Sequence, residues 1–323
     1  MRVRGARAWT AAALLLALSI LLGLTVGGVR LSVFDLWSGR GQAGETARLV
    51  ASLRLPRVLL AALVGGCLAL AGAALQALLK NPLADPFLLG TSGGAATGAA
   101  FAALAGASPL LSPGAAFAGA AASSLGVAAL ARRGGRLDLQ RLILAGLIAN
   151  AFFSAVLLAV FSVASGEAAR TMLFWMMGSL SDASSGKTLS LLPYAIPGCI
   201  ALLWSASRLN LFAVGEENAA ALGVHVERSK RLVFLAASLL TGSAVAFAGV
   251  IGFVGLLVPH AVRSVVGNDQ RLLLPLSGLS GAALLVAADA VARSALAPAE
   301  LPIGAVTAAL GAPVFAYLLL RNP

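Results

Sequence analysis

Long apolar segments without charged residues alternate with short polar connections along almost the whole chain. An uncharged apolar stretch of about 20 residues is long enough to cross a bilayer as a helix. The pattern predicts ten such spans, at residues 8–29, 57–79, 88–106, 113–131, 141–163, 189–206, 232–249, 251–266, 272–291 and 304–320. We therefore expect an all-α, polytopic membrane protein in which residues 1–323 form a single transmembrane domain.

Three segments depart from this simple pattern. The predicted span 251–266 is short and contains Pro259, which favours a kinked or half-length helix. Residues 168–181 are apolar but too few to cross, so we expect a re-entrant or interfacial helix there. The N-terminus resembles a secretory signal, yet its apolar run from Ala8 to Val29 is longer than a signal core, and no clear cleavage site follows. We expect an uncleaved first helix.

Composition and charge agree with a membrane protein. Hydrophobic residues make up 59% of the chain and charged residues 11%, whereas soluble domains carry about 25% charged residues. The net charge of +11 lies mainly in short loops, which favours a topology signal over nucleic-acid binding. If the N-terminus is cytoplasmic, 15 of the 23 Lys and Arg residues fall on the cytoplasmic side. We therefore expect both termini in the cytoplasm.

The sequence offers no catalytic or metal-binding constellation. His225 and His260 have no cysteine or carboxylate at ligand spacing, so we expect no metal site. Residues 181–188 resemble a phosphate-binding loop, but Ser181 stands where the first glycine is required. We expect a chain that is not an enzyme and binds no cofactor itself. The cysteines, Cys67 and Cys199, lie in apolar runs and are interpreted as packing residues.

Polar and small residues within the predicted spans indicate helix packing. Gln76 and Asn150 either bond across helices or line a water-filled path, and we favour the first interpretation. Gly90, Gly94 and Gly98 recur every four positions on one helix face. Small residues at that spacing let helices approach closely, which we favour over a pore lining.

The longest hydrophilic segment, residues 207–231, contains a candidate docking site for a soluble partner. Glu216 and Glu217 precede an alanine-rich run that ends at Gly223. Acidic residues favour a helix N-terminus and glycine favours its end, so we expect a short cytoplasmic helix pair in this loop. An amphipathic helix lying on the membrane is the alternative.

Arginines are also expected on the outer side. Arg54 and Arg57 flank Pro56 at the predicted outer mouth of the second span, and Arg293 lies just beyond the ninth. Arginines outside oppose the usual topology bias, so a basic outer rim indicates an acidic protein partner. The alternative is that these side chains only reach up to the membrane surface. Asp289 is four residues before Arg293 and is expected to pair with it.

Seven motifs, in order, resemble the FecCD family of ABC-transporter permeases, which includes importers of vitamin B12, siderophores and heme. The resemblance covers the chain from about Arg54 to Pro323. The motifs are RLPR at 54–57, QALLKNPLADPFLLG at 76–90, WMMGSL at 175–180, GEENAAALGV at 215–224, GVIGFVGLLVPHAVR at 249–263, AADAVAR at 287–293 and ELPIGAVTAALGAP at 300–313.

The resemblance implies a type II importer permease, a ten-helix subunit that forms a homodimer in the bacterial inner membrane with the transport path between the copies. It implies that two cytoplasmic ATP-binding subunits, which use ATP and Mg²⁺, dock on Gly215, Glu216, Glu217, Ala221, Leu222 and Gly223. It implies that a periplasmic substrate-binding protein docks on Arg54, Arg57 and Arg293. By position, the inner gate comprises Asn81, Pro82, Leu83, Leu139 and Gln140.

The expected function is import of an iron chelate, either a ferric siderophore or heme, with cobalamin as the alternative cargo. Two other classes stay open on the residues alone. A secondary transporter would couple through charged groups within the membrane, for which Asp289 is the nearest candidate. A receptor or scaffold without transport would leave the gate-like turn at 80–86 and the broken eighth span unexplained.

Overall fold

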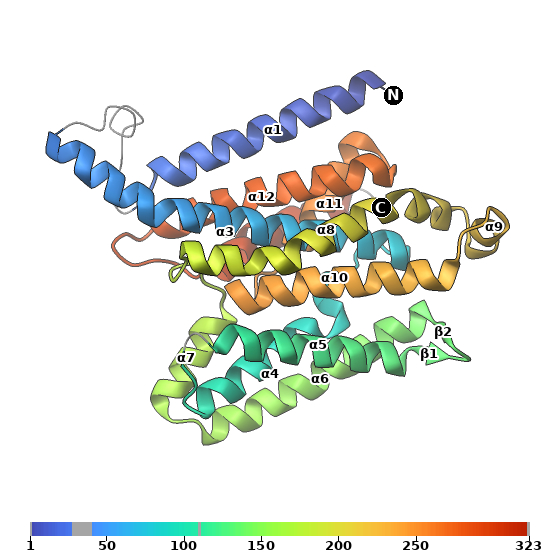
Figure 1. The fold of residues 1–323 in the computed structure, drawn as a ribbon, viewed down its shortest axis with the longest axis horizontal. Helices are drawn as coiled ribbons and strands as arrows, with labels where there is room; N and C mark the ends of the chain where they lie inside the picture. The colour runs from blue at the N-terminus through green and yellow to red at the C-terminus, as the bar shows by residue number, and fades with distance from the viewer. Residues whose placement is uncertain (1, 28–40, 109–110, 322–323) are drawn as a thin grey trace.

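The computed structural model describes residues 2–27, 41–108 and 111–321, and most of these residues are helical. Figure 1 shows long helices running side by side along the longest axis of the molecule. The helices are α1 (Arg2–Thr25), α3 (Gly41–Leu79), α4 (Thr91–Leu104), α5 (Ser112–Leu130), α6 (Leu139–Val163), α7 (Gly166–Met176), α8 (Ser185–Ala213), α9 (Glu216–Ala221), α10 (Val226–Ala248), α11 (Val254–Val266), α12 (Gln270–Ser294) and α13 (Ile303–Arg321). A 3-10 helix, η1 (Pro86–Leu89), precedes α4, and the short strands β1 (Arg132–Arg133) and β2 (Arg136–Leu137) form a hairpin between α5 and α6.

A helix occupies each of the ten predicted spans, so the predicted all-α polytopic fold is confirmed. Within the described residues, seven helices are long and apolar enough to cross a membrane. The other three predicted spans hold the shorter helices α4, α11 and α13. Helix α11 begins only at Val254 and contains Pro259, as expected for a half-length helix. The segment expected not to cross, residues 168–181, overlaps α7, which begins at Gly166 and is 11 residues long.

Several helices extend past the predicted ends. Helix α3 begins at Gly41 instead of Arg57 and has 39 residues. At 1.5 Å per residue it is about 58 Å long, nearly twice the hydrocarbon thickness of a bilayer. Pro56 therefore lies inside this helix and not in its first turn. Helix α8 likewise continues to Ala213, and α10 begins at Val226, so the predicted loop 207–231 is only residues 214–225. Hydropathy does not detect helical turns that continue into water.

Helix α3 lies at the centre of the main bundle, with α8, α10, α11 and α12 packed around it (Figure 1). Two close contacts depend on glycines. A Cβ at Gly65 would collide with the backbone of Gly281 in α12, and a Cβ at Gly72 would collide with the backbone of Gly255 in α11. Two neighbours therefore pack against α3 backbone to backbone, as small residues allow in membrane helices.

Helices α4, α5, α6 and α7 form a second layer beside the main bundle (Figure 1). A Cβ at Gly94 or Gly98 of α4 would collide with the backbone of Gly119 or Ala115 of α5, which confirms the predicted close packing. Helix α6 keeps a broad apolar face uncovered by the rest of the chain. This face includes Leu144, Leu147, Ile148, Phe152 and Leu158.

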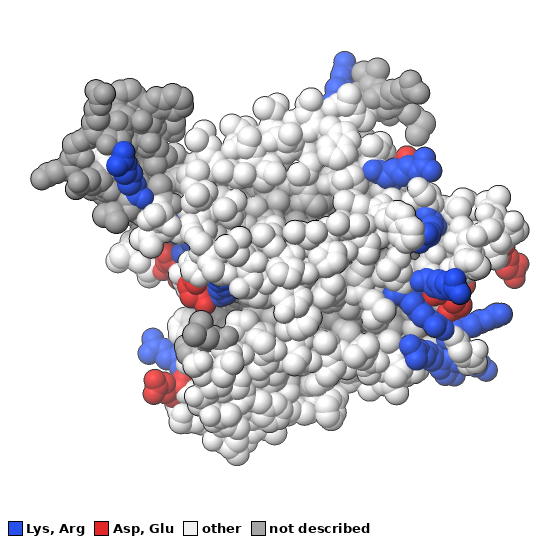
Figure 2. All heavy atoms as spheres, in the orientation of Figure 1, with Lys and Arg blue, Asp and Glu red and all other residues white. Residues whose placement is uncertain are grey.

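The two ends of the bundle differ in charge, as Figure 2 shows. We define the basic end by residues 80–83, the hairpin, residues 214–225 and the turn 267–269. Helix α1 begins and α13 ends at this end as well (Figure 1). The opposite end contains residues 105–108, 164–184 and 295–302. Lysines and arginines in these segments or in the adjoining helix ends include Lys80, Arg132, Arg133, Arg136, Arg141, Arg208, Arg228, Lys230, Arg231 and Arg271.

Candidate functional site

The predicted docking loop folds into one short helix, α9, at the tip of the basic end. Gly215 precedes it with φ 119°, and Glu216 and Glu217 occupy its first turn, where carboxylates complement the helix dipole. Gly223 ends it with φ 83°, a backbone conformation that glycine adopts without strain. The expectation of a helix pair is wrong, because α8 and α10 continue into the loop and leave room for only one helix.

Helix α9 has a buried side and a side open to water. Ala219 is fully buried against the bundle, and the Asn218 amide donates to the carbonyl of Val214, so the helix is anchored. Leu222 is 67% exposed although it is a large apolar residue. Glu217 is exposed as well, so the water-facing side of this segment presents an acidic and an apolar side chain. The exposed residues of the predicted docking set are Glu217, Ala221, Leu222 and Gly223.

A groove of about 920 Å³ separates α9 from the hairpin. Leu139 and Gln140, two of the predicted gate residues, line it. Asp138 caps α6 by accepting from the backbone N–H groups of Arg141 and Gln140, and these hydrogen bonds lower its pKa. The first turn of α6 is therefore fixed beside the groove.

The other predicted gate residues form the tight turn after α3. The Asn81 side chain accepts a hydrogen bond of 2.9 Å from the Leu83 backbone N–H, and the Asn81 carbonyl accepts from Ala84. Pro82 and Leu83 are exposed at the basic end. This turn does not line the groove, so the structure places the two halves of the predicted gate at one end of the molecule but at different surfaces.

A second cavity, the recess, opens halfway along α6 and has a volume of about 470 Å³. Asn150 projects from α6 and donates a hydrogen bond of 3.1 Å to the Phe87 carbonyl of η1, which confirms that it bonds across helices. Phe253, with φ 68°, starts α11 on the other side of the recess. Sequence reasoning missed Asp85 and Phe253 as lining residues, although both lie in motifs of the resemblance.

Gln76 supplies a hydrogen-bond donor that Pro259 removes from the backbone of α11. Pro259 has no N–H to donate to the carbonyl of Gly255, four residues earlier. The Gln76 amide of α3 donates to that carbonyl and to the carbonyl of Leu256, at 3.4 and 3.3 Å. Its oxygen accepts a hydrogen bond of 2.9 Å from Arg263. The predicted role of Gln76 in joining helices is therefore confirmed.

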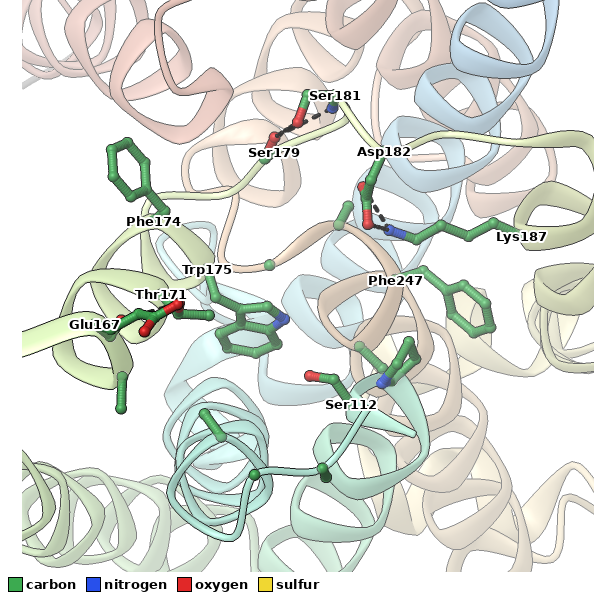
Figure 3. A pocket seen from close by; sticks show the side chains of 18 of the residues that line it. Ser112, Glu167, Thr171, Phe174, Trp175, Ser179, Ser181, Asp182, Lys187 and Phe247 are labelled. Carbon is green, nitrogen blue, oxygen red and sulfur yellow. Dashed lines mark hydrogen bonds and ion pairs between the residues drawn. The ribbon is translucent and has the colours of Figure 1, made fainter. Parts of the chain in front are cut away.

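A third cavity, the α7 cavity, lies at the opposite end and has a volume of about 670 Å³. Figure 3 shows Trp175 at its centre, with Glu167 and Thr171 of α7 on one side. The ion pair of Asp182 and Lys187, at 2.7 Å, lies on the other side. No pattern in the sequence predicts this cavity; its one signal there is the tryptophan-containing motif at 175–180, in a segment too short to cross.

The three arginines of the predicted outer rim form one cluster, in which Arg57 and Arg293 pair with Asp289 and Arg54 lies near Arg293. That carboxylate is 1% exposed and pairs with both Arg57 and Arg293 at 2.9 Å, which confirms the predicted Asp289–Arg293 pair. Arg57 also pairs with Glu300 at 2.9 Å. Arg54 donates to the carbonyls of Leu24 and Thr25. Arg293 donates to the carbonyl of Gly23.

Most of this cluster is internal. Arg54 is 8% exposed and Arg293 is 5% exposed, because both side chains bind the last carbonyls of α1, which have no partner within that helix. Arg57 and Glu300 are the members that reach the surface, with side-chain exposures of 12% and 41%. The sequence placed all three arginines at a rim, because it did not show that α3 begins at Gly41 and that α1 covers Arg54.

Comparison with known proteins agrees with this architecture. The chain matches the FecCD transport family over residues 15–321. It is 45% identical over 282 residues to the cobalamin import system permease protein BtuC of Halobacterium salinarum, covering 85% of this chain and 74% of that one. It is 40% identical over 316 residues to the hemin transport system permease protein HmuU of Yersinia pestis, covering 95% and 94%.

A solved structure has the same fold over the full length. It is an inward-facing putative metal-chelate type ABC transporter, with a TM-score of 0.87, 31% sequence identity, and coverage of 98% of this chain and 99% of that chain. Because the family match extends over nearly all residues and the helices superpose as a whole, the chain belongs to the FecCD transport family.

Proposed function

We propose that this chain is the permease subunit of an ABC importer that carries an iron chelate, a ferric siderophore or heme, across the bacterial inner membrane. The observation that carries the proposal is the full-length structural match to a putative metal-chelate type ABC transporter. Cobalamin is the second candidate cargo, since the relative at 45% identity is named as a cobalamin import permease.

In this proposal two copies of the chain form the transport path between them. The uncovered apolar face of α6 supports this arrangement, because it offers contact area to lipid or to a second copy. The recess beside Asn150 would then be part of the wall along which cargo passes. Apart from Asp85, its lining is apolar or uncharged, which suits transient contact with a large chelate, whereas a tight site would slow release.

The basic end would face the cytoplasm, with both termini there, because Lys and Arg collect on the cytoplasmic side of membrane proteins. Two ATP-binding subunits, which use ATP and Mg²⁺, would dock on α9. The anchored knob with Leu222 exposed supports this docking role. ATP binding would bring the two ATPase subunits together, move α9 and switch the permease between outward-open and inward-open states.

The opposite end would receive the periplasmic substrate-binding protein. Arg57 would contact acidic side chains of that partner. Arg54 and Arg293 would support this surface from inside, by binding the end of α1. Support comes from the partial exposure of Arg57 and from its pairing with Glu300, an acid that a partner's carboxylate could replace. The α7 cavity lies at this end and would be open to released cargo.

The test is uptake into proteoliposomes that contain the permease with its ATPase and its binding protein. We expect ATP-dependent uptake of a ferric siderophore or of heme, and none from the permease alone. Uptake of cobalamin only would establish the second candidate. Transport by the permease alone, driven by an ion gradient and lost with a proton ionophore, would instead establish a secondary transporter and overturn the proposal.

A further inference from the structure

Lys230 lies where three segments of the basic end meet. Its ammonium is 2.6 Å from a carboxylate oxygen of Glu216 on α9. It donates a hydrogen bond of 3.3 Å to the carbonyl of Leu137 on β2. It also pairs at 3.4 Å with Glu227, one turn earlier on its own helix, α10. One buried charge therefore joins α9, the hairpin and α10.

These contacts match the bonding capacity of a lysine. An ammonium has three N–H donors and no acceptor, and the three acceptors come from three different segments. The Lys230 side chain is only 6% exposed, although it lines the groove between α9 and the hairpin, so these three acceptors replace most of its hydration. A buried charge is strongly destabilised when one partner is removed. The three segments are thus held to one another through Lys230.

Glu227 completes the connection to the hairpin. One of its oxygens pairs with Lys230, and the other accepts a hydrogen bond of 2.8 Å from the Leu137 backbone N–H. Both backbone groups of Leu137 are therefore bound by this pair. The Arg231 side chain also donates to the carbonyl of Gly135, at the hairpin turn. The hairpin is attached to α10 on more than one side.

The connection continues directly into the start of α6. Leu137 is followed by Asp138, the residue that caps α6 through the N–H groups of Gln140 and Arg141. A displacement of α9 that pulls on Glu216 would act through Lys230 on Leu137, and from there on the first turn of α6. Covalent bonds and ionic contacts to the buried Lys230 ammonium bridge the whole distance.

We propose that Lys230 is a positioning residue that transmits movement of α9 to the hairpin and to the first turn of α6, where the expected gate residues Leu139 and Gln140 lie. This inference rests on the proposed function, because an ATPase docked on α9 supplies the movement. It distinguishes the two glutamates of α9: Glu216 transmits within the chain, whereas Glu217 is exposed and faces the partner.

The test uses the complete importer, with ATPase and binding protein, in proteoliposomes. ATP hydrolysis and cargo uptake are measured together for wild type, Lys230→Met and Glu216→Gln. Glu216→Gln keeps the bonds of Lys230 to Glu227 and Leu137, so it tests the link even if Lys230→Met does not fold. The control is Arg228→Met, which removes a cation from an exposed position on the same helix.

We expect both variants to bind the ATPase and hydrolyse ATP but to transport about tenfold less cargo per ATP, a ratio within the usual range of coupling between sites. Arg228→Met should behave like wild type, and Lys230→Arg should regain most of the coupling. With a spin label at Gln140→Cys in each copy, the distance between the two labels should change on ATP binding. This change should be lost when Glu216→Gln is added.

Two results would overturn the inference while leaving the proposed function intact. One is wild-type cargo uptake per ATP in Glu216→Gln and in any Lys230→Met that folds. The other is parallel loss of ATPase binding, hydrolysis and uptake in Glu216→Gln, which would make the ion pair a structural anchor only. Absence of ATP-driven uptake in the wild-type importer would contradict the proposed function itself.

Discussion

At the scale of single residues, polar groups in this membrane protein mainly satisfy bonds that the helices leave open. Gln76 supplies the donor that Pro259 removes from α11. Arg54 and Arg293 supply donors to the end of α1. In a bilayer an unsatisfied backbone carbonyl cannot form a hydrogen bond to water instead, so losing one of these side-chain donors should destabilise the fold.

Replacing Gln76 by leucine tests this role. The change keeps an apolar side chain of similar size but leaves the Gly255 carbonyl without its donor and removes a partner from Arg263. We expect a loss of about 1–3 kcal/mol in unfolding free energy, since buried groups lose their partners. The measurement is thermal or denaturant unfolding in detergent. Gln140→Leu, at an exposed position, is the control and should change little; equal stability of the two variants would contradict the assignment.

At the scale of elements, glycines decide which helices touch, and one short helix, α9, stays accessible at the basic end. Helix α3 packs backbone to backbone with α11 and α12 only because Gly65 and Gly72 have no side chain. Helix α9 is held by the buried Ala219 and by the ion pair of Glu216 with Lys230, and its other residues are exposed. The same chain thus combines tight packing in the bundle with an accessible knob at its end.

Gly72→Ala should damage the contact between α3 and α11. The added methyl group would meet the backbone of Gly255, which can move only with its helix. We expect a loss of about 1–3 kcal/mol, the usual cost of overpacking a core. Gly126→Ala is the matched control, because a Cβ there meets nothing and alanine favours helix by about 0.5–1 kcal/mol. Unfolding midpoints of the two variants should therefore move in opposite directions.

Helix α9 can be tested by binding of the ATPase subunit. Leu222→Lys and Glu217→Lys change exposed positions and should weaken ATPase binding by at least about tenfold, as loss of an interface hot spot does. Thermal stability should stay near that of the unchanged protein, because neither side chain is buried. Lys80→Glu, exposed at the same end but outside α9, is the control. Binding unaffected by all three changes would remove α9 from the interface.

At the scale of the whole molecule, charge separates the two ends of the bundle. The basic end combines α9, the hairpin and both chain ends, and the opposite end combines the arginine cluster with the α7 cavity. The chain belongs to the FecCD transport family, and this division fits the proposal that its two ends meet different partners.

Arg57 and Glu300 give a test of docking at the opposite end. Arg57→Gln should weaken binding-protein affinity by about tenfold at low salt, because it removes the partly exposed cation that a partner's acid would meet. Glu300→Gln should strengthen affinity, since it frees Arg57 from an internal competitor. Both differences should shrink as ionic strength rises. Binding titrations that show the same direction for both variants would exclude this docking mode.

The sequence by itself determined the membrane architecture, because charge-free apolar runs, prolines and glycine spacing are local properties. It also indicated α9, the pairing of Asp289 with Arg293, and the bonding roles of Gln76 and Asn150. Only the tertiary structure decided that α3 begins at Gly41, that Arg54 and Arg293 are covered by α1, and that Lys230 joins three segments. These facts depend on which helices, distant in sequence, pack against one another, and local hydropathy does not contain that information.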